Sequence, residues 1–432
     1  MQMQARKTLN ALTGARFLAA YWVLIYHFTI QFRYVRFPGK PAVSTSLPSL
    51  LAPTLLQGHL GVDFFFLLSG FILAYTYLSS DGGLRGTKRA FWVARIARIY
   101  PVYLLGLILG LYPFYLEEHH VARRLVIPGI LHLLMLHAWI PIGLDWNQPS
   151  WSLGVESTFY LLFPFVLPLV ARLPRRSLWL LVFVSWLLFA AINLDLLAFT
   201  QAGFGHLFFF WTDLVRYEPL VSMPEFIAGT ALGLLFTRDG GLAIPWLPRL
   251  RGWTFDILIL VMLALLSGVM DIIYAMKLNS SPVDIGAPFA LPMLAGVIVL
   301  LAYQRGIFAW LLSTPIMVWL GEISYGIYIL QKPVWALFDK HLWSVVDGIS
   351  MFLIHRPAND YMLLAGLSLL LIACASFSFK FLETPLRRWI RATWSKPAPK
   401  VVTQVAVQSS REPVPWSVRN NNIRHEDETY QA

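Results

Sequence analysis

The sequence is poor in charged residues and nearly lacks cysteine. Only 13% of its 432 residues are Asp, Glu, Lys or Arg, about half the share found in soluble globular proteins. So little charge cannot cover a water-exposed surface, and this excludes a cytosolic enzyme. The single cysteine, Cys374, excludes a disulfide framework and a cysteine-based metal site.

Apolar residues are abundant, at 57% of the chain. A bilayer core about 30 Å thick requires roughly 20 consecutive apolar residues per helix. Windows of that length begin near Leu9, Leu60, Val102, Pro149, Leu178, Met223, Phe255, Pro288, Leu311 and Leu363. They predict an all-α, polytopic integral membrane protein with about ten transmembrane helices. A shorter apolar run over residues 126–140 predicts one re-entrant or interfacial segment.

The distribution of Lys and Arg predicts the orientation. The formal net charge is +11, and ten spans with a cytoplasmic N-terminus place 22 of the 34 Lys and Arg residues inside and nine outside. This bias follows the positive-inside rule. An eleventh crossing at 126–140 would reverse the later loops and abolish the bias. Both termini are therefore predicted in the cytoplasm. Because these residues lie between apolar stretches, they do not indicate a nucleic-acid partner.

Composition divides the chain into two parts. Residues 1–395 contain the apolar windows and are predicted to form one membrane domain. Residues 396–432 are rich in Pro, Asn and charged residues, which predicts a disordered cytoplasmic tail.

Charged residues inside the first and fourth spans mark a candidate site, because a charge near mid-membrane is costly and usually faces a cavity. Arg16 and His27 are eleven residues apart, so they share one helix face about 16 Å apart. Ser152 and Glu156 share a face at the start of the fourth span. The ten-span arrangement puts Glu156 and His27 at similar depth, which predicts a carboxylate-supported base. The alternative is that Arg16 contacts lipid phosphates and His27 contacts a backbone carbonyl.

Two further spans carry polar residues. In the second span, Asp63 is followed two turns later by Ser69, and a structural ion pair would explain Asp63 equally well. The ninth span has a stripe of hydroxyl and amide groups at helical spacing, formed by Ser324, Tyr325, Tyr328 and Gln331. Such groups suit a sugar, but they also join helices to one another.

A pair of arginines, Arg95 and Arg98, lies one turn apart on the helix that leads into the third span. Paired guanidinium groups recognise phosphates well. Lipid headgroups are the alternative ligand.

Together, in this order and spacing, these segments resemble the acyltransferase family 3, the integral-membrane O-acyltransferases that modify bacterial surface polysaccharides and some lipids or antibiotics. The resemblance covers about residues 9–390. The first motif pairs Arg16 with His27, and the second is the Gly-Val-Asp element at 61–71. The third consists of Arg95 and Arg98, which precede Ile99, Pro101 and Tyr103. The fourth is the Trp151-Ser152 signature with Glu156, Phe159 and Tyr160, and the last is the closing element at 381–388. Gln331 stands where many members have His, which argues against proton transfer there.

The resemblance implies an enzyme of the bacterial inner membrane that moves an acyl group, acetyl above all, from acyl-CoA to a hydroxyl of a polysaccharide or lipid-linked saccharide. His27 would be the general base, supported by Glu156, with Arg16 guiding the thioester arm and Arg95 and Arg98 meeting the donor phosphates. Supporting or acceptor-binding roles would fall to Asp63, Ser69, Trp151, Ser152, Ser324, Tyr325, Tyr328 and Gln331. No metal or permanently bound cofactor is expected, and the partners are membrane lipid, donor and acceptor.

Many members also carry an extracytoplasmic esterase-like domain, whereas a stand-alone acyltransferase is expected here. Two alternatives remain. A transporter or flippase would use the same buried charges as a substrate pathway. A donor-feeding subunit would pass acetyl groups to a separate transferase through an acyl-enzyme on His27 or Ser152.

Overall fold

A computed structural model describes residues 7–32, 52–117, 121–201, 217–238, 247–276, 286–356 and 359–394. The chain divides into two units, Met1–Lys396 and Pro397–Ala432, and all described residues belong to the first. The tail predicted from residue 396 lies outside the described residues.

The described part of the chain is all-α, as predicted, with a single β-bridge between Leu78 and Leu84 as its only β pairing. Two five-residue π-helices, Phe28–Phe32 and Phe379–Glu383, adjoin α1 and α15. In chain order the α-helices are α1 (Asn10–His27), α3 (Ala52–Leu55), α4 (Leu60–Tyr77), α5 (Lys88–Glu117), α6 (Val126–Leu133), α7 (Trp151–Val170), α8 (Arg175–Gln201), α10 (Pro219–Arg238), α11 (Gly252–Ala275), α12 (Gly286–Ala302), α13 (Gly306–Leu312), α14 (Pro315–Ile354), α15 (Asp360–Ser378) and α16 (Thr384–Trp394).

Seven segments in the described residues are long and apolar enough to cross a membrane, and an eighth is added if the bent pair α12 and α13 counts as one span. The protein is therefore a polytopic membrane protein. The other two predicted spans fall on α1 and α14. Their hydropathy is lowered by the polar residues that drew attention to them, including Arg16 and Gln331. The count of ten stays a prediction.

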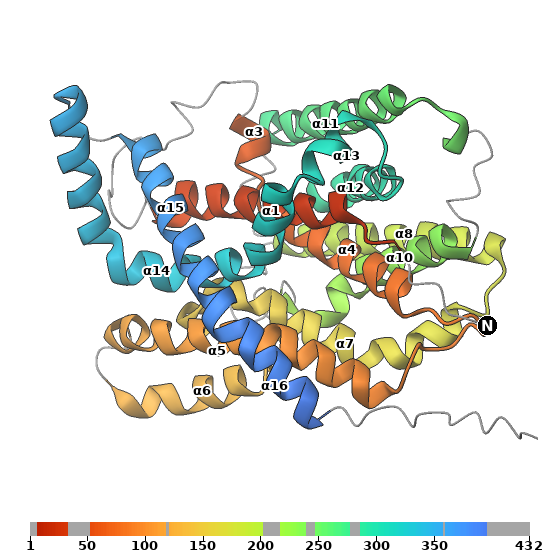
Figure 1. The fold of residues 1–432 in the computed structure, drawn as a ribbon, viewed down its shortest axis with the longest axis horizontal. Helices are drawn as coiled ribbons and strands as arrows, with labels where there is room; N and C mark the ends of the chain where they lie inside the picture. Colours follow the sequence, from red (N-terminus) through yellow and green to blue (C-terminus); the bar gives the residue numbers. More distant parts are fainter. Residues whose placement is uncertain are drawn as a thin grey trace, which may run out of the picture. The chain divides into compact units, whose positions relative to one another are not determined.

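The short apolar run after residue 126 forms α6, whose eight residues extend about 12 Å and cannot cross a bilayer. Its outward side chains, among them Ile127 and Ile130, are apolar, as expected for a segment at the membrane interface. It is attached to α5 (Figure 1), because the hydroxyls of Tyr100 and Tyr103 donate to the carbonyls of Leu133 and His132 at 3.0 and 2.7 Å.

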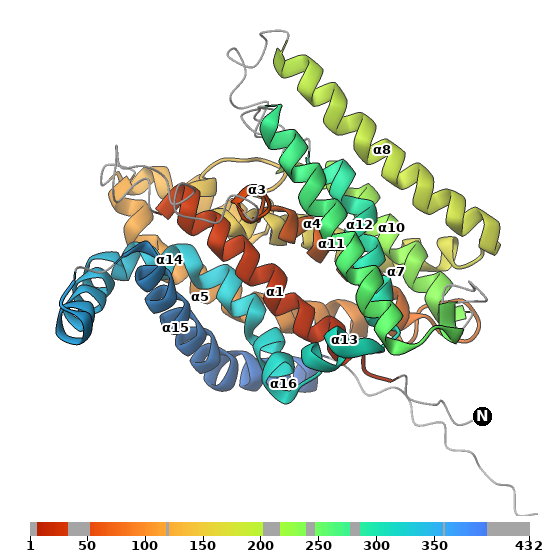
Figure 2. The ribbon, with the colours of Figure 1, turned by 90° about the horizontal axis from the view of Figure 1, so that it is seen from above.

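Helix α1 occupies the middle of the bundle. It packs against α14 on one side and α4 on the other, as the view in Figure 2 shows. Helix α4 in turn pairs with α10, while α5 packs against α14 and α16. Half of the 18 residues of α1 are buried, so other helices cover much of this partly polar span.

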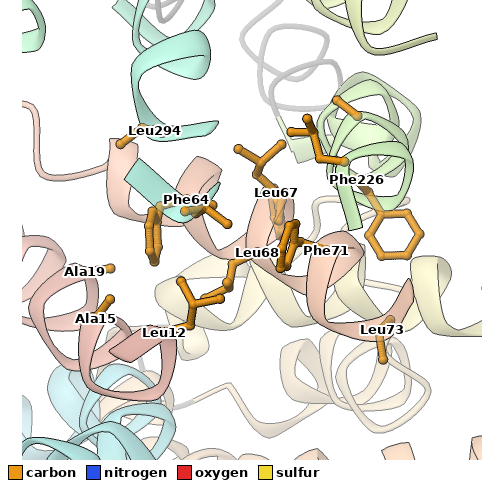
Figure 3. Packing of buried hydrophobic residues seen from close by; sticks show 14 of the residues in the cluster. Leu12, Ala15, Ala19, Phe64, Leu67, Leu68, Phe71, Leu73, Phe226 and Leu294 are labelled. Carbon is orange, nitrogen blue, oxygen red and sulfur yellow. The ribbon is translucent and has the colours of Figure 1, made fainter. Parts of the chain in front are cut away.

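Small residues on α1 bring its neighbours close. Ala15 and Ala19 face Phe64 and Leu68 of α4 in the buried core (Figure 3). Toward α14, a Cβ atom at Gly321 would lie 1.9 Å from the Thr13 carbonyl oxygen. Toward α13, a Cβ atom at Gly14 would lie 2.1 Å from the carbonyl oxygen of Leu312, the last residue of that helix. These backbone contacts require glycine, as is common where membrane helices cross closely.

We expect Gly321→Ala to destabilise the protein, because the added methyl group would push α14 away from α1. Overpacking of this kind costs about 1–3 kcal/mol. Gly268→Ala on α11 is the matched control, since a Cβ atom added there would have nothing within 4 Å and helix propensity alone favours alanine by roughly 0.5–1 kcal/mol. Thermal unfolding in detergent should show a lower midpoint for Gly321→Ala only. Equal midpoints would contradict the close approach.

Candidate active site

Helices α1, α4, α5, α7 and α14 enclose a cavity of about 90 Å³. This is room for a few water molecules or a short acyl group. Nine of the thirteen predicted site residues line it, namely Arg16, Ser69, Arg95, Arg98, Ser152, Glu156, Ser324, Tyr325 and Tyr328. Apolar side chains such as Phe65, Leu68 and Ile72 complete the wall. Residues from distant parts of the sequence therefore meet in one cavity.

Three arginines converge on this cavity. Arg16 lies within electrostatic range of Arg95, Arg98 and Glu156. Arg95 donates from Nη2 to the Tyr77 hydroxyl at 3.0 Å and lies over aromatic rings. The guanidinium groups of Arg16 and Arg98 make no hydrogen bond to any described residue. Both can therefore still bind an anion.

Glu156 supplies the one carboxylate in the cavity wall. It accepts a hydrogen bond from the Ser69 hydroxyl at 3.1 Å and another from the Tyr160 hydroxyl, one turn along α7. With one carboxylate against three guanidinium groups, the cavity carries net positive charge. Tyr160 was not among the predicted site residues, although its spacing of four from Glu156 places both on one helix face.

Tyr328 and Ser152 join α14 to α7 at one end of the cavity. Their hydroxyl oxygens are 2.9 Å apart, and Ser152 also donates to the Pro149 carbonyl at 3.1 Å. The other two hydroxyls of the predicted stripe are bound to backbone. Ser324 donates to Gly321 at 2.9 Å, and Tyr325 donates across to Ile99 of α5 at 3.0 Å. The stripe therefore joins helices and lines the cavity at once.

His27 lies outside this cavity. It is the last residue of α1, is 6% exposed, and its imidazole lies beside the amide of Gln331, which is fully buried. Gln331 donates from Nε2 to the Tyr328 carbonyl at 2.8 Å. The histidine is thus connected through one turn of α14 to the Tyr328 end of the cavity.

The predicted pairing of Glu156 with His27 is wrong in this structure, because Glu156 accepts hydrogen bonds from Ser69 and Tyr160 and lies within electrostatic range of Arg16, whereas the His27 imidazole lies beside Gln331. The physical reason lies at the start of α7. Asn147 and Ser150, just before the helix, are fully buried. The helix therefore begins among buried residues, so packing and not a membrane surface positions its first turns, and Glu156 faces Ser69 and Arg16.

Asp63 and Trp151 also lie outside the residues that line the cavity. Asp63 is half-buried in the first turn of α4. The Trp151 ring packs against Phe66 and Tyr217, with centroid distances of 6.0 and 4.9 Å. Trp151 therefore contributes to the packing between helices next to Ser152.

A histidine pair that the sequence did not single out holds the segment before α7. The rings of His132 and His137 stack with centroids 4.1 Å apart, and both are fully buried. Their Nε2 atoms bond the carbonyls of Gly143 and Ser150 at 3.0 and 2.9 Å. These bonds hold the buried segment from which α7 begins.

Fold and cavity together define an integral membrane protein with a cationic, hydroxyl-lined site between its helices. The chain belongs to the acyltransferase family 3, whose family model, described as an acyltransferase domain, matches residues 9–381. This confirms the family inferred from the motifs.

Two relatives show how far the similarity extends. The acyltransferase MdmB of Streptomyces mycarofaciens is 39% identical over 176 residues, which are 40% of this chain and 42% of the relative. The peptidoglycan O-acetyltransferase OatA of Listeria monocytogenes is 23% identical over 410 residues, which are 89% of this chain and 56% of the relative. The matches thus cover about half the length of these relatives. No solved structure gives a significant match.

We expect Glu156→Gln to lower stability, because three guanidinium groups would then face one another without a carboxylate. Arg16→Gln in the same chain should restore part of the loss, so that the two effects differ from additivity by about 1–3 kcal/mol. Thermal unfolding of both single variants and the double variant measures this coupling. Additive effects would mean that Arg16 and Glu156 do not interact.

Proposed function

We propose that the protein is an O-acyltransferase that moves an acyl group, acetyl above all, from acyl-CoA to a hydroxyl group of a cell-surface polysaccharide or lipid-linked saccharide. The observation that carries this proposal is the cationic cavity in a family 3 chain, with the His27 and Gln331 pair one helical turn beyond its Tyr328 end. The names of the relatives MdmB and OatA point to the same chemistry.

The donor phosphates would bind Arg95 and Arg98, and Arg16 would guide the thioester arm. The support is the excess of positive charge and the two guanidinium groups that make no hydrogen bond to described residues. Charge-assisted bonds from arginine suit phosphate oxygens. The thioester carbonyl would then lie toward Tyr328 and Ser152, at the end of the cavity nearest His27.

In the transfer step, His27 takes the proton of the acceptor hydroxyl and the oxygen attacks the thioester carbonyl. The carbon–sulfur bond breaks, CoA leaves as thiolate, and the proton held by His27 neutralises it. Gln331 takes the orienting role first assigned to Glu156, since its amide lies beside the imidazole. Glu156 balances part of the arginine charge and orients Tyr160 and Ser69.

His27→Ala should lower the rate of transfer by about 10²–10⁴-fold, because general-base help has that size. The matched control is His355→Ala, an exposed histidine at the end of α14, which should leave the rate unchanged. The measurement is acetylation of envelope glycans by mass spectrometry, with thiol release from acetyl-CoA by the purified protein. Wild-type acetylation by His27→Ala would refute the mechanism. A wild-type protein that transports but releases no thiol would favour the transporter.

We propose the cytoplasmic membrane as the location, with both termini in the cytoplasm. Cysteine replacements in a Cys374→Ser background test this orientation at two exposed positions, Asp81 between α4 and α5 and Ile142 between α6 and α7. The basic residues that follow Asp81 predict that its replacement reacts with an impermeant thiol reagent only from the cytoplasmic side. The replacement of Ile142 should react only from outside. The reverse pattern would overturn the topology.

A further inference from the structure

The arginine cluster continues beyond the cavity to the end of the described chain. Arg387 of α16 lies within electrostatic range of Arg98 and of Arg391. It is half-buried, and its Nε atom is shielded from water without a hydrogen-bond partner among the described residues. A planar guanidinium group with a buried N–H in this state is prepared to bind another anion.

Glu383 holds this arginine in place. The carboxylate is 2% exposed, 4.0 Å from the Arg387 guanidinium, and accepts a hydrogen bond from Ser378 at 3.4 Å. It closes the π-helix Phe379–Glu383, a distortion that is frequent at functional sites. Glu383 also lies within electrostatic range of Arg98 and Tyr325, both of which line the cavity. Glu383 therefore interacts both with Arg387 and with residues of the cavity.

The charge balance of this extended cluster indicates which kind of ligand it binds. The extended cluster contains four arginines and two carboxylates. The arginines are Arg16, Arg95, Arg98 and Arg387, and the carboxylates are Glu156 and Glu383. Adding the next neighbours, Arg391 and Glu322, leaves the same excess of two positive charges. Like charges at this spacing inside a membrane protein are unfavourable unless an anion joins them. The excess extends from the cavity to α16, which suits a ligand with several separate phosphates.

We infer that Arg387, positioned by Glu383, binds a phosphate group of the nucleotide part of the acyl donor. The inference rests on the proposed function and extends it. The nucleotide of acyl-CoA carries a diphosphate and a separate phosphate, so a donor whose phosphates meet Arg95 and Arg98 still has a phosphate for a site beyond the cavity. Arg387 is a binding residue and Glu383 a positioning residue.

The test is binding of two probes to the purified protein by calorimetry: acetyl-CoA, and S-acetylpantetheine, which has no phosphate. Arg387→Ala should weaken binding of acetyl-CoA by about tenfold to a hundredfold, the size of a charge-assisted hydrogen bond, and leave S-acetylpantetheine unaffected. Arg388→Ala, an exposed arginine on the same helix, is the matched control. Glu383→Gln should weaken acetyl-CoA binding too, and the double variant should be no weaker than Arg387→Ala alone.

The outcomes separate the two proposals. If the wild-type protein binds neither probe, the proposed function fails. If it binds acetyl-CoA and Arg387→Ala binds as tightly as Arg388→Ala, or loses both probes alike, the inference is overturned. A change confined to retention of phosphatidylglycerol would also overturn it, because the phosphate would then belong to a lipid. If Arg387→Ala does not fold, Arg387→Lys replaces it, and a several-fold loss for acetyl-CoA only is expected.

Discussion

The arrangement depends on one electrostatic constraint: three arginines share a small cavity with a single carboxylate. Guanidinium groups of this kind remain charged in a protein, so they cannot escape repulsion by losing a proton. Glu156 offsets part of the charge, and Ser69 and Tyr160 hold that carboxylate in place. The remaining positive charge is tolerable where a bound anion completes the cluster. The stability of such a site depends on a bound anion as well as on the packing of the protein.

Helical period explains why much of the site was predictable. Residues three, four or eleven apart lie on one face whatever the tertiary fold, so the pairs Arg95 with Arg98 and Ser152 with Glu156 could be assigned from spacing. The need to keep charge away from lipid then turns each such face inward. These two constraints bring nine predicted residues into one cavity.

The relative position of two packed helices along their axes was not predictable from helical period. It depends on contacts far apart in the chain, such as the buried bonds from His132 and His137 that fix the segment before α7. The predicted contact between Glu156 and His27 failed for this reason. The contact of Arg95 with Tyr77 likewise has no local signal. The predicted spans on α1 and α14 do not pass a hydropathy test, because the polar residues of the candidate site lower the mean hydropathy of these two helices.

Helix α14 links the two parts of the site. Tyr328 contacts Ser152 at the cavity, and one turn later Gln331 lies beside His27. Since a turn rises about 5.4 Å, the spacing between cavity and imidazole is set by a rigid element, and glycine contacts hold that element against α1. The arginine cluster and His27 therefore need not touch. Under the proposed transfer, a donor bound in the cavity therefore has only to extend past Tyr328 to meet His27.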